Sequence, residues 1–201
     1  MPVSTPASRR LCLFGGSFDP VHLAHVALAE AAWRQARLDH ILFVPAWRSP
    51  HKLGQQMASA EDRLAMLRLA VAGLPWAGIS TWELERAAPS YSWQTVEHFS
   101  ELSGPETELF WLLGADQWEK LPAWARPEYL AARVTFLVFP RGDIAVLPRA
   151  GFRHQFIDVR HPASSTAVRE AVRARQPLAG LVPDAVAAYI TEKGLYRPGK
   201  G

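Results

Sequence analysis

The chain has 201 residues, with 22 Lys and Arg against 19 Asp and Glu, so its formal net charge is +3. Hydrophobic residues make up 49% and charged residues 20%, which is enough to bury a core and excludes general disorder. The apolar runs are far shorter than the roughly 18 residues of a membrane span, and the small positive excess favours anionic partners, either nucleic acid or a small phosphate-bearing molecule.

We expect a single domain over residues 1–201, with residues 1–9 as a disordered lead-in and residues 160–201 as its helical C-terminal part. Residues 1–10 contain no apolar stretch long enough for a secretion signal. The single cysteine, Cys12, cannot form a disulfide within the chain. Together these features predict a cytoplasmic protein.

Six short apolar or β-branched runs predict strands, and stretches between them predict helices. The predicted strands are Leu11–Phe14, Ile41–Val44, Gly78–Thr81, Leu109–Leu113, Val134–Phe139 and Phe156–Val159. The predicted helices are His22 to about Arg37, Glu61–Val71 with Ser59 as its cap, Ser92–Leu102, Pro127–Ala132 and two near the C-terminus, the last opened by Pro183 and closed by Gly194. This alternation predicts a Rossmann-like α/β fold in three layers, with a central, mostly parallel sheet and helices on both faces.

The loop between the first strand and the first helix carries the sharpest pattern. Gly15 and Gly16 let the backbone approach a ligand, and the helix N-terminus that follows suits a phosphate. Asp19 is expected to cap this helix, and Pro20 to fit its first turn. In an open α/β sheet, this edge is where ligands bind.

His22 and His25 are three residues apart, so both project from one face of the first helical turn and can point at the same phosphate. Alternatively, they are surface residues or half of a metal site. A metal site is disfavoured, because no cysteine and no further histidine or carboxylate lies nearby at ligand spacing. The chain also lacks the G-x-x-x-x-G-K-[ST] and G-x-G-x-x-G patterns of P-loop and redox dinucleotide proteins.

Two further loops carry residues that can contact a ligand. After the second strand, Lys52 can reach a phosphate or belong to an ordinary surface loop. After the fourth strand, Asp116 can bond a ribose hydroxyl or cap the next helix, and Trp124 can stack on a planar cation or pack in the core. We assign Trp111 and Trp118 to packing, because the chain has 8 tryptophans and any one of them more often packs than contacts a ligand.

A second candidate anchor stands near the C-terminus, where Ser164, Ser165 and Thr166 precede a predicted helix. Hydroxyl side chains there can cap the helix, and Arg169, about one turn on, can clamp a phosphate at the same end. Taken alone, the segment is better interpreted as an ordinary helix cap beside a solvated arginine, but its pairing with the first loop favours the phosphate-binding interpretation.

Together, these segments resemble the nucleotidyltransferase superfamily related to the HIGH-type aminoacyl-tRNA synthetases. Residues 15–25 are similar to its G-[GT]-[ST]-F-D-P-x-[HT]-x-G-H signature, although Ala24 replaces the glycine. Residues 164–169 are similar to S-S-T-x-[IV]-R, residues 45–52 to P-x-x-x-x-P-H-K, residues 83–92 to E-L-x-R-x-G-x-S-Y-T and residues 114–124 to G-x-D-x-x-x-x-L-x-x-W. Because the variable position of this signature is a histidine here, His22, the segment resembles the nicotinate- or nicotinamide-mononucleotide adenylyltransferase branch.

The resemblance implies transfer of AMP from ATP to nicotinate mononucleotide, giving nicotinate adenine dinucleotide and pyrophosphate. It implies catalytic roles for His22, His25 and Arg169. It further implies ATP contacts at Gly15, Gly16, Ser17, Phe18, Gly114, Asp116, Ser164, Ser165 and Thr166, and mononucleotide contacts at Lys52, Tyr91, Ser92, Trp124 and Ala125. Mg²⁺ is expected with the ATP phosphates, without a protein side chain as ligand.

Two alternatives stay open. One is the same chemistry on nicotinamide mononucleotide or another phosphate acceptor, and the other is a non-catalytic module that binds nucleotides or nucleic acid. The intact histidine pair and the second motif argue against lost catalysis, and no Lys/Arg stripe interleaved with aromatic residues supports nucleic acid. We therefore expect small-molecule substrates, no nucleic acid and no membrane, with a homo-oligomer left open.

Overall fold

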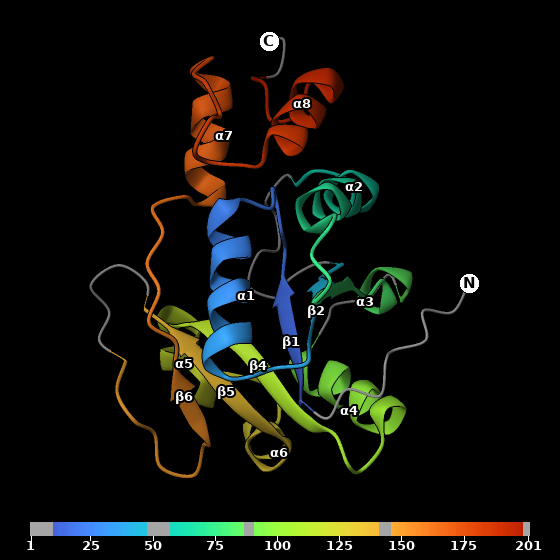
Figure 1. The fold of residues 1–201 in the computed structure, drawn as a ribbon, viewed down its shortest axis with the longest axis vertical. Coiled ribbons are helices and arrows are strands. Elements are labelled where there is room, and N and C mark those ends of the chain that lie inside the picture. The colour runs from blue at the N-terminus through green and yellow to red at the C-terminus, as the bar shows by residue number, and fades with distance from the viewer. Residues whose placement is uncertain (1–9, 48–56, 87–90, 141–145, 199–201) are drawn as a thin grey trace.

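The computed structural model describes residues 10–47, 57–86, 91–140 and 146–198. Within these ranges, six strands form one sheet in the order β3-β2-β1-β4-β5-β6, and every neighbouring pair is parallel (Figure 1). The strands are β1 (Arg10–Gly16), β2 (His40–Pro45), β3 (Ala77–Ile79), β4 (Glu108–Gly114), β5 (Val134–Phe139) and β6 (His154–Phe156). The strand order reverses between β1 and β4.

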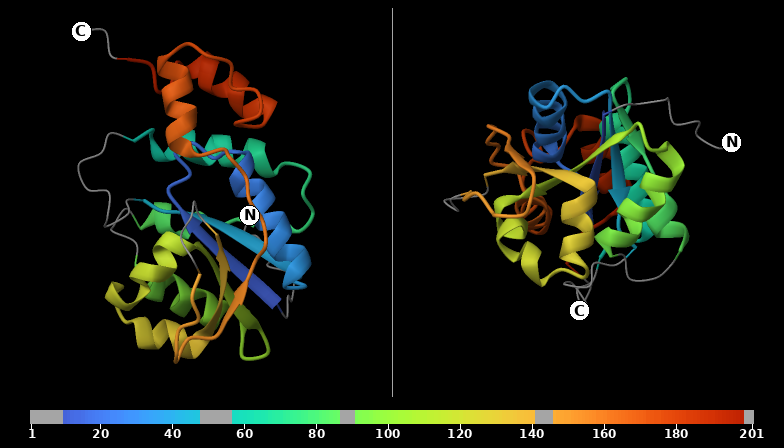
Figure 2. Two further views of the ribbon diagram at one scale, coloured as in Figure 1. Left: turned by 90° about the vertical axis from the view of Figure 1, so that its left-hand side faces the viewer. Right: turned by 90° about the horizontal axis from the view of Figure 1, so that it is seen from below.

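Helices cover both faces of this sheet, as Figure 2 shows, so the predicted three-layer α/β fold is confirmed. The helices in the described ranges are α1 (Leu23–Gln35), α2 (Ala60–Val71), α3 (Trp82–Glu85), α4 (Ser92–Ser103), α5 (Ala115–Lys120), the 3₁₀ turn η2 (Leu121–Ala123), α6 (Pro127–Arg133), α7 (Ser165–Arg173) and α8 (Asp184–Lys193). None of them is long and apolar enough to cross a membrane.

Two hydrophobic clusters lie on opposite faces of the sheet, because alternate side chains of a strand point to opposite sides. Cys12 and Phe14 of β1 face the cluster that includes α1, α2, α7 and α8. Leu11 and Leu13 face the cluster that includes α4, α5 and α6. The C-terminal helices therefore share a core with α1 and α2.

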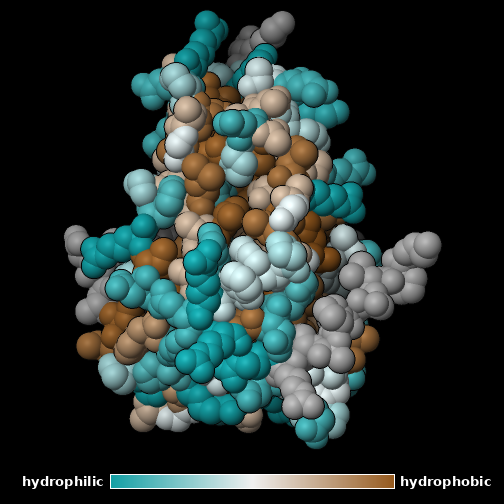
Figure 3. Space-filling model, in the orientation of Figure 1, coloured by the Kyte–Doolittle hydropathy of each residue, from teal (hydrophilic) through white to brown (hydrophobic). Residues whose placement is uncertain are grey.

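The C-terminal helices also bring apolar side chains to the surface. In Figure 3, hydrophobic residues gather in the upper half of the face, where α2, α7 and α8 lie, whereas much of the lower half is polar. Leu178, Leu181 and Leu195 are among the partly buried residues that pack on this core.

Two strand positions differ from the sequence-based expectation. β3 and β6 begin earlier than predicted, because Ala77 pairs with Ile41, and the polar residue His154 pairs with Phe136. The apolar residue Ile157 follows β6 as a buried loop residue. The first helix begins at Leu23 and not at position 22, and helices α3 and α5 were not predicted, because four to six residues show no clear helical period.

Candidate active site

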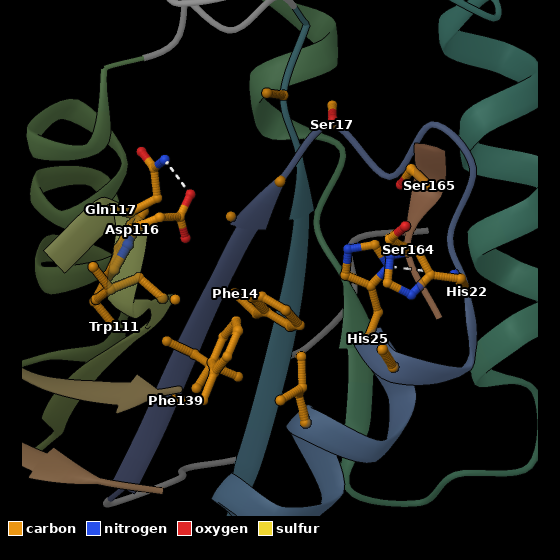
Figure 4. A pocket seen from close by; sticks show the side chains of 18 of the residues that line it. Phe14, Ser17, His22, His25, Trp111, Asp116, Gln117, Phe139, Ser164 and Ser165 are labelled. Atoms are coloured by element: carbon orange, nitrogen blue, oxygen red, sulfur yellow. Dashed lines mark hydrogen bonds between the residues drawn. The ribbon is translucent and has the colours of Figure 1, made fainter. Parts of the chain in front are cut away.

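A cavity of about 1080 Å³ opens at the C-terminal ends of β1 and β4, where the strand order reverses. The N-termini of α1 and α7 also contribute to its wall. In Figure 4, His22, His25, Ser164 and Ser165 lie on one side of β1, and Trp111 and Asp116 lie on the other. This position is the one where open α/β sheets bind ligands.

Two glycines at the strand ends leave room for the side chains that shape the cavity. A Cβ atom on Gly15 would approach the Trp111 ring to 3.0 Å. A Cβ atom on Gly114 would lie 2.7 Å from Asp116 Oδ1. Because of this missing atom, the Asp116 carboxylate can lie directly against the end of β4.

The two histidines form the centre of one wall. Their rings stack with centroids 3.6 Å apart and an interplanar angle of 27°. His22 is the N-cap residue of α1 and is 7% exposed, and its backbone N–H donates to His25 Nδ1 at 3.2 Å. Because Nδ1 accepts this bond, a neutral His25 ring carries its proton on Nε2 and presents a donor there.

The first loop is held differently from the sequence-based expectation. Asp19 does not cap α1, because its Oδ1 atom accepts from the Tyr196 hydroxyl at 2.7 Å and from the Ala58 N–H at 3.1 Å. Pro20 lies before the first helical turn, and its carbonyl accepts from Ser165 Oγ at 3.0 Å. The Asp19 carboxylate that the local pattern assigned to the helix cap is therefore engaged in tertiary hydrogen bonds.

Phe18 lies in the core and not among the residues that line the cavity. Its side chain is 1% exposed, and its ring centroid is 5.0 Å from that of His25 and 5.6 Å from that of Phe14. The structure therefore places this ring behind His25, where it packs against the catalytic candidate.

The helix α7 motif meets the first loop. Ser164 caps α7 by accepting from the Ala167 N–H at 3.1 Å, as the sequence predicts. Arg169 Nη1 donates to the Asp19 carbonyl at 2.7 Å, and Nη2 donates to Thr166 Oγ1 at 3.2 Å. These contacts bring the Arg169 guanidinium and the N-termini of α1 and α7 to one cavity. The guanidinium is a full positive charge, and each helix N-terminus carries a partial one.

The opposite end of the cavity is lined by the start of α4 and the segment after η2. Tyr91 is the N-cap residue of α4 and is 43% exposed. The Trp124 ring meets that of Trp111 edge-on, with centroids 6.4 Å apart. Buried beside them, Glu83 accepts from Thr95 Oγ1 at 2.5 Å and so joins α3 to α4.

The structure brings most of the predicted site residues to this one cavity. Those lining it are Gly15, Gly16, Ser17, His22, His25, Tyr91, Ser92, Gly114, Asp116, Trp124, Ala125, Ser164, Ser165, Thr166 and Arg169. Phe18 is in the core, as described above, and Lys52 lies outside the described residues.

Sequence reasoning did not select several further lining residues. Trp111, assigned to packing, is 4% exposed but also lines the cavity, whereas Trp118 does not. Arg160 and His161 line it as well, and their position directly before the Ser164 motif was the available signal. Glu83 lies within the segment already singled out and was not assigned a role.

The described residues contain no group of three or more His, Cys, Asp or Glu side chains that could hold a metal ion. The positively charged groups that the described residues bring to this cavity include the Arg169 guanidinium, and the N-termini of α1 and α7 add partial positive charge. Such an arrangement suits a polyanionic ligand with several phosphates.

Known proteins match the chain along most of its length. A family described as Cytidylyltransferase-like matches residues 13–171. A protein of Methylacidiphilum infernorum named "Probable nicotinate-nucleotide adenylyltransferase" is 37% identical over 199 residues, covering 98% of this chain and 97% of that protein. A protein of the same name from Geobacillus kaustophilus is 40% identical over 190 residues, covering 93% and 86%.

The fold matches solved structures at much lower identity. The Plasmodium falciparum nicotinic acid mononucleotide adenylyltransferase complexed with APC has a TM-score of 0.77 and 17% identity, covering 94% of this chain and 97% of that chain. The same enzyme complexed with NaAD gives a TM-score of 0.76 at 18% identity, with the same coverage of both chains. At this identity the likeness concerns the fold.

Proposed function

This chain belongs to the cytidylyltransferase-like family and, within it, to the nicotinate-nucleotide adenylyltransferases, and we propose that it transfers AMP from ATP to nicotinate mononucleotide. The products are nicotinate adenine dinucleotide and pyrophosphate. One observation carries the proposal: the stacked histidines of α1 and the capped N-terminus of α7 with Arg169 face the same cavity at the strand-order reversal. We place this activity in the cytoplasm, where ATP is at hand.

The nucleophile needs no general base. The 5′-phosphate of the mononucleotide has a second pKa of about 6 and is already a dianion at pH 7. One of its oxygens attacks the α-phosphorus of ATP, and the bond from that phosphorus to the bridging oxygen breaks, so that pyrophosphate leaves. The obstacle is repulsion between anions, which positioning and positive potential can overcome.

His22, His25 and Arg169 supply that potential together with the N-termini of α1 and α7. The Nε2–H of neutral His25 is a donor for the phosphate oxygens on which charge develops. Mg²⁺ enters as part of the substrate MgATP. Its ligands would then be phosphate oxygens and water, because Mg²⁺ binds substrate phosphates and keeps several waters in nucleotide sites.

The acceptor end of the cavity suits a pyridinium ring that carries a carboxylate. The Trp124 ring can stack on the planar cation. The backbone N–H groups at the start of α4, near Ser92, and at Ala125 can donate to the carboxylate, and a helix N-terminus favours that negative charge. A neutral carboxamide gains less from the same groups, so nicotinate mononucleotide is the preferred acceptor.

Pyrophosphate release tests the proposal directly. The purified protein is supplied with ATP and Mg²⁺, together with either nicotinate mononucleotide or nicotinamide mononucleotide. We expect release with the acid and slower release with the amide. If the amide reacted faster, the assigned acceptor would be wrong, and if neither acceptor gave release, the enzymatic function would be wrong.

A further inference from the structure

A buried arginine holds the back of the first loop. Arg63 of α2 is 2% exposed, and its Nη1 atom donates to the carbonyls of Ser17 and Ala46, both at 2.8 Å. Its Nη2 atom donates to the Trp47 carbonyl at 3.2 Å. Burial lowers the pKa of Arg63, but its reference value is so high that the guanidinium keeps its charge.

The C-terminal segment reaches the same loop. The Tyr196 hydroxyl donates to Asp19 Oδ1 at 2.7 Å, and the Asp19 side chain is largely buried, at 6% exposed. Burial, and next the charge of Asp19, raise the pKa of Tyr196 above its ordinary value near 10. The hydroxyl therefore stays protonated and donates over the whole pH range in which an enzyme of this kind is assayed.

The end of α8 directs Tyr196 back toward the loop. Gly194 has a φ of 62° and ends the helix in the left-handed conformation, and the Leu195 N–H donates to the Ile190 carbonyl at 3.1 Å. Tyr196 itself has a φ of 61°, and Phe18 in the loop has a φ of 45°. Residues with side chains adopt this region rarely, so both conformations persist because the surroundings hold them.

The two sides of the loop serve different purposes. On the cavity side, Arg169 and Ser165 of α7 bind the carbonyls of Asp19 and Pro20. On the far side, Arg63 and Tyr196 do not line the cavity. They nevertheless hold the residues that lead directly into the N-cap of α1, where the histidines stand.

We propose that Tyr196 is a positioning residue for adenylyl transfer, since its hydroxyl fixes Asp19 and thereby the first loop, whose geometry aims His22 and His25 at the reacting phosphate. Arg63 supports the same loop through the Ser17 carbonyl. The inference rests on the proposed function, because the reaction supplies its readout. It adds a residue that does not touch the substrate to the machinery of the site.

Two tyrosines of the C-terminal segment allow a matched test. The Tyr189 hydroxyl donates to Asp62 Oδ1 at 2.9 Å, so it ties α8 to α2 with the same chemistry, through a carboxylate that is not part of the first loop. Tyr196→Phe and Tyr189→Phe each remove one hydroxyl and one bond to a carboxylate. We expect Tyr196→Phe to lower kcat about tenfold with both KM values within about twofold, because a small misplacement of catalytic groups is costly. Tyr189→Phe is expected to keep kcat within about twofold of the unaltered protein, since no catalytic group moves.

Asp19 variants give a second measurement. Asp19→Asn keeps an acceptor oxygen for Tyr196 and is expected to retain most of kcat. Asp19→Ala also breaks the bond from the Ala58 N–H, so it is expected to lower kcat at least as far as Tyr196→Phe does. Adding Tyr196→Phe to Asp19→Ala is expected to cause no further loss, because the Tyr196 hydroxyl has already lost its acceptor in Asp19→Ala. The comparison of Asp19→Asn with Asp19→Ala also tests the proposal if Tyr196→Phe fails to fold.

The outcomes separate this inference from the proposed function. If the unaltered protein releases no pyrophosphate with either mononucleotide, the proposed function fails and the inference falls with it. If the unaltered protein is active but the two tyrosine variants have equal kcat, only the inference is overturned. Independent losses from Tyr196→Phe and Asp19→Ala that multiply in the double variant would overturn it as well.

Discussion

The stacked histidines share one wall of the cavity but differ in their connections, since His22 caps α1 and His25 accepts a bond from the His22 backbone. Replacing either ring by alanine is expected to lower kcat by about two orders of magnitude, as the loss of one transition-state donor does elsewhere. The KM values change less. Steady-state pyrophosphate release measures the effect, and thermal unfolding serves as the control for an intact fold. Near-normal turnover in both variants would contradict the catalytic role of the pair.

The Trp124 ring offers a test at the acceptor end. Trp124→Ala is expected to raise the KM for nicotinate mononucleotide about fivefold with little change in kcat, because a cation–π contact of about 1 kcal/mol is lost equally from bound substrate and transition state. Trp33→Ala is the control, since Trp33 stacks on Trp76 and does not line the cavity. An equal rise in KM in both variants would show that Trp124 acts only through packing.

Two serine caps allow the effect of a helix cap on stability to be measured separately from its effect on the active site. Ser59 caps α2 and Ser164 caps α7, and each accepts the third backbone N–H of its helix, at 3.0 and 3.1 Å. Each serine-to-alanine change is expected to cost about 1 kcal/mol in the free energy of unfolding, because one N–H loses its partner. Only Ser164 lines the cavity, so only Ser164→Ala should also raise the KM for ATP. Urea unfolding and ATP titration measure the two effects, and a raised KM in Ser59→Ala would contradict this division.

The ends of helices were predictable where they depend on residues close together in the sequence. The Ser59 cap and the left-handed Gly194 at the end of α8 were predicted and are confirmed, because each depends on residues within one helical turn. The predicted Asp19 cap was wrong, since Tyr196 and Ala58 occupy that carboxylate. A local sequence pattern cannot indicate a hydrogen-bond partner such as Tyr196, which lies 177 residues away from Asp19.

For the whole molecule, two partly buried histidines predict a pH-dependent stability. Burial lowers the pKa of His40. It also lowers the pKa of His98, where it is the largest of several causes. The unfolded chain then binds more protons than the folded one below about pH 6.5, so the free energy of unfolding falls as the pH drops through that value. His40→Gln is expected to flatten this slope between about pH 7 and pH 5.5 in urea unfolding. An unchanged slope would mean that His40 does not contribute.

The site as a whole was predictable because its motifs stand at the ends of successive elements of an α/β sheet. Parallel strands place the ends of β1 and β4 side by side, which brings Gly15 and Gly114 to one edge. Arg63 and Tyr196 were not predictable in the same way. The Arg63 guanidinium binds backbone carbonyls and the Tyr196 hydroxyl binds a carboxylate, and only the folded chain presents these acceptors to them.

The contacts of Asp19 with Arg169 and Tyr196 span 150 and 177 residues, which has a consequence for protein synthesis. The ribosome makes the first loop long before the side chains of Arg169 and Tyr196 that hold it. A growing chain can form β1 and α1 while its first loop still lacks these partners. We therefore expect the growing chain to become competent for nucleotide chemistry only after residues 169–196 have been made and have reached the first loop.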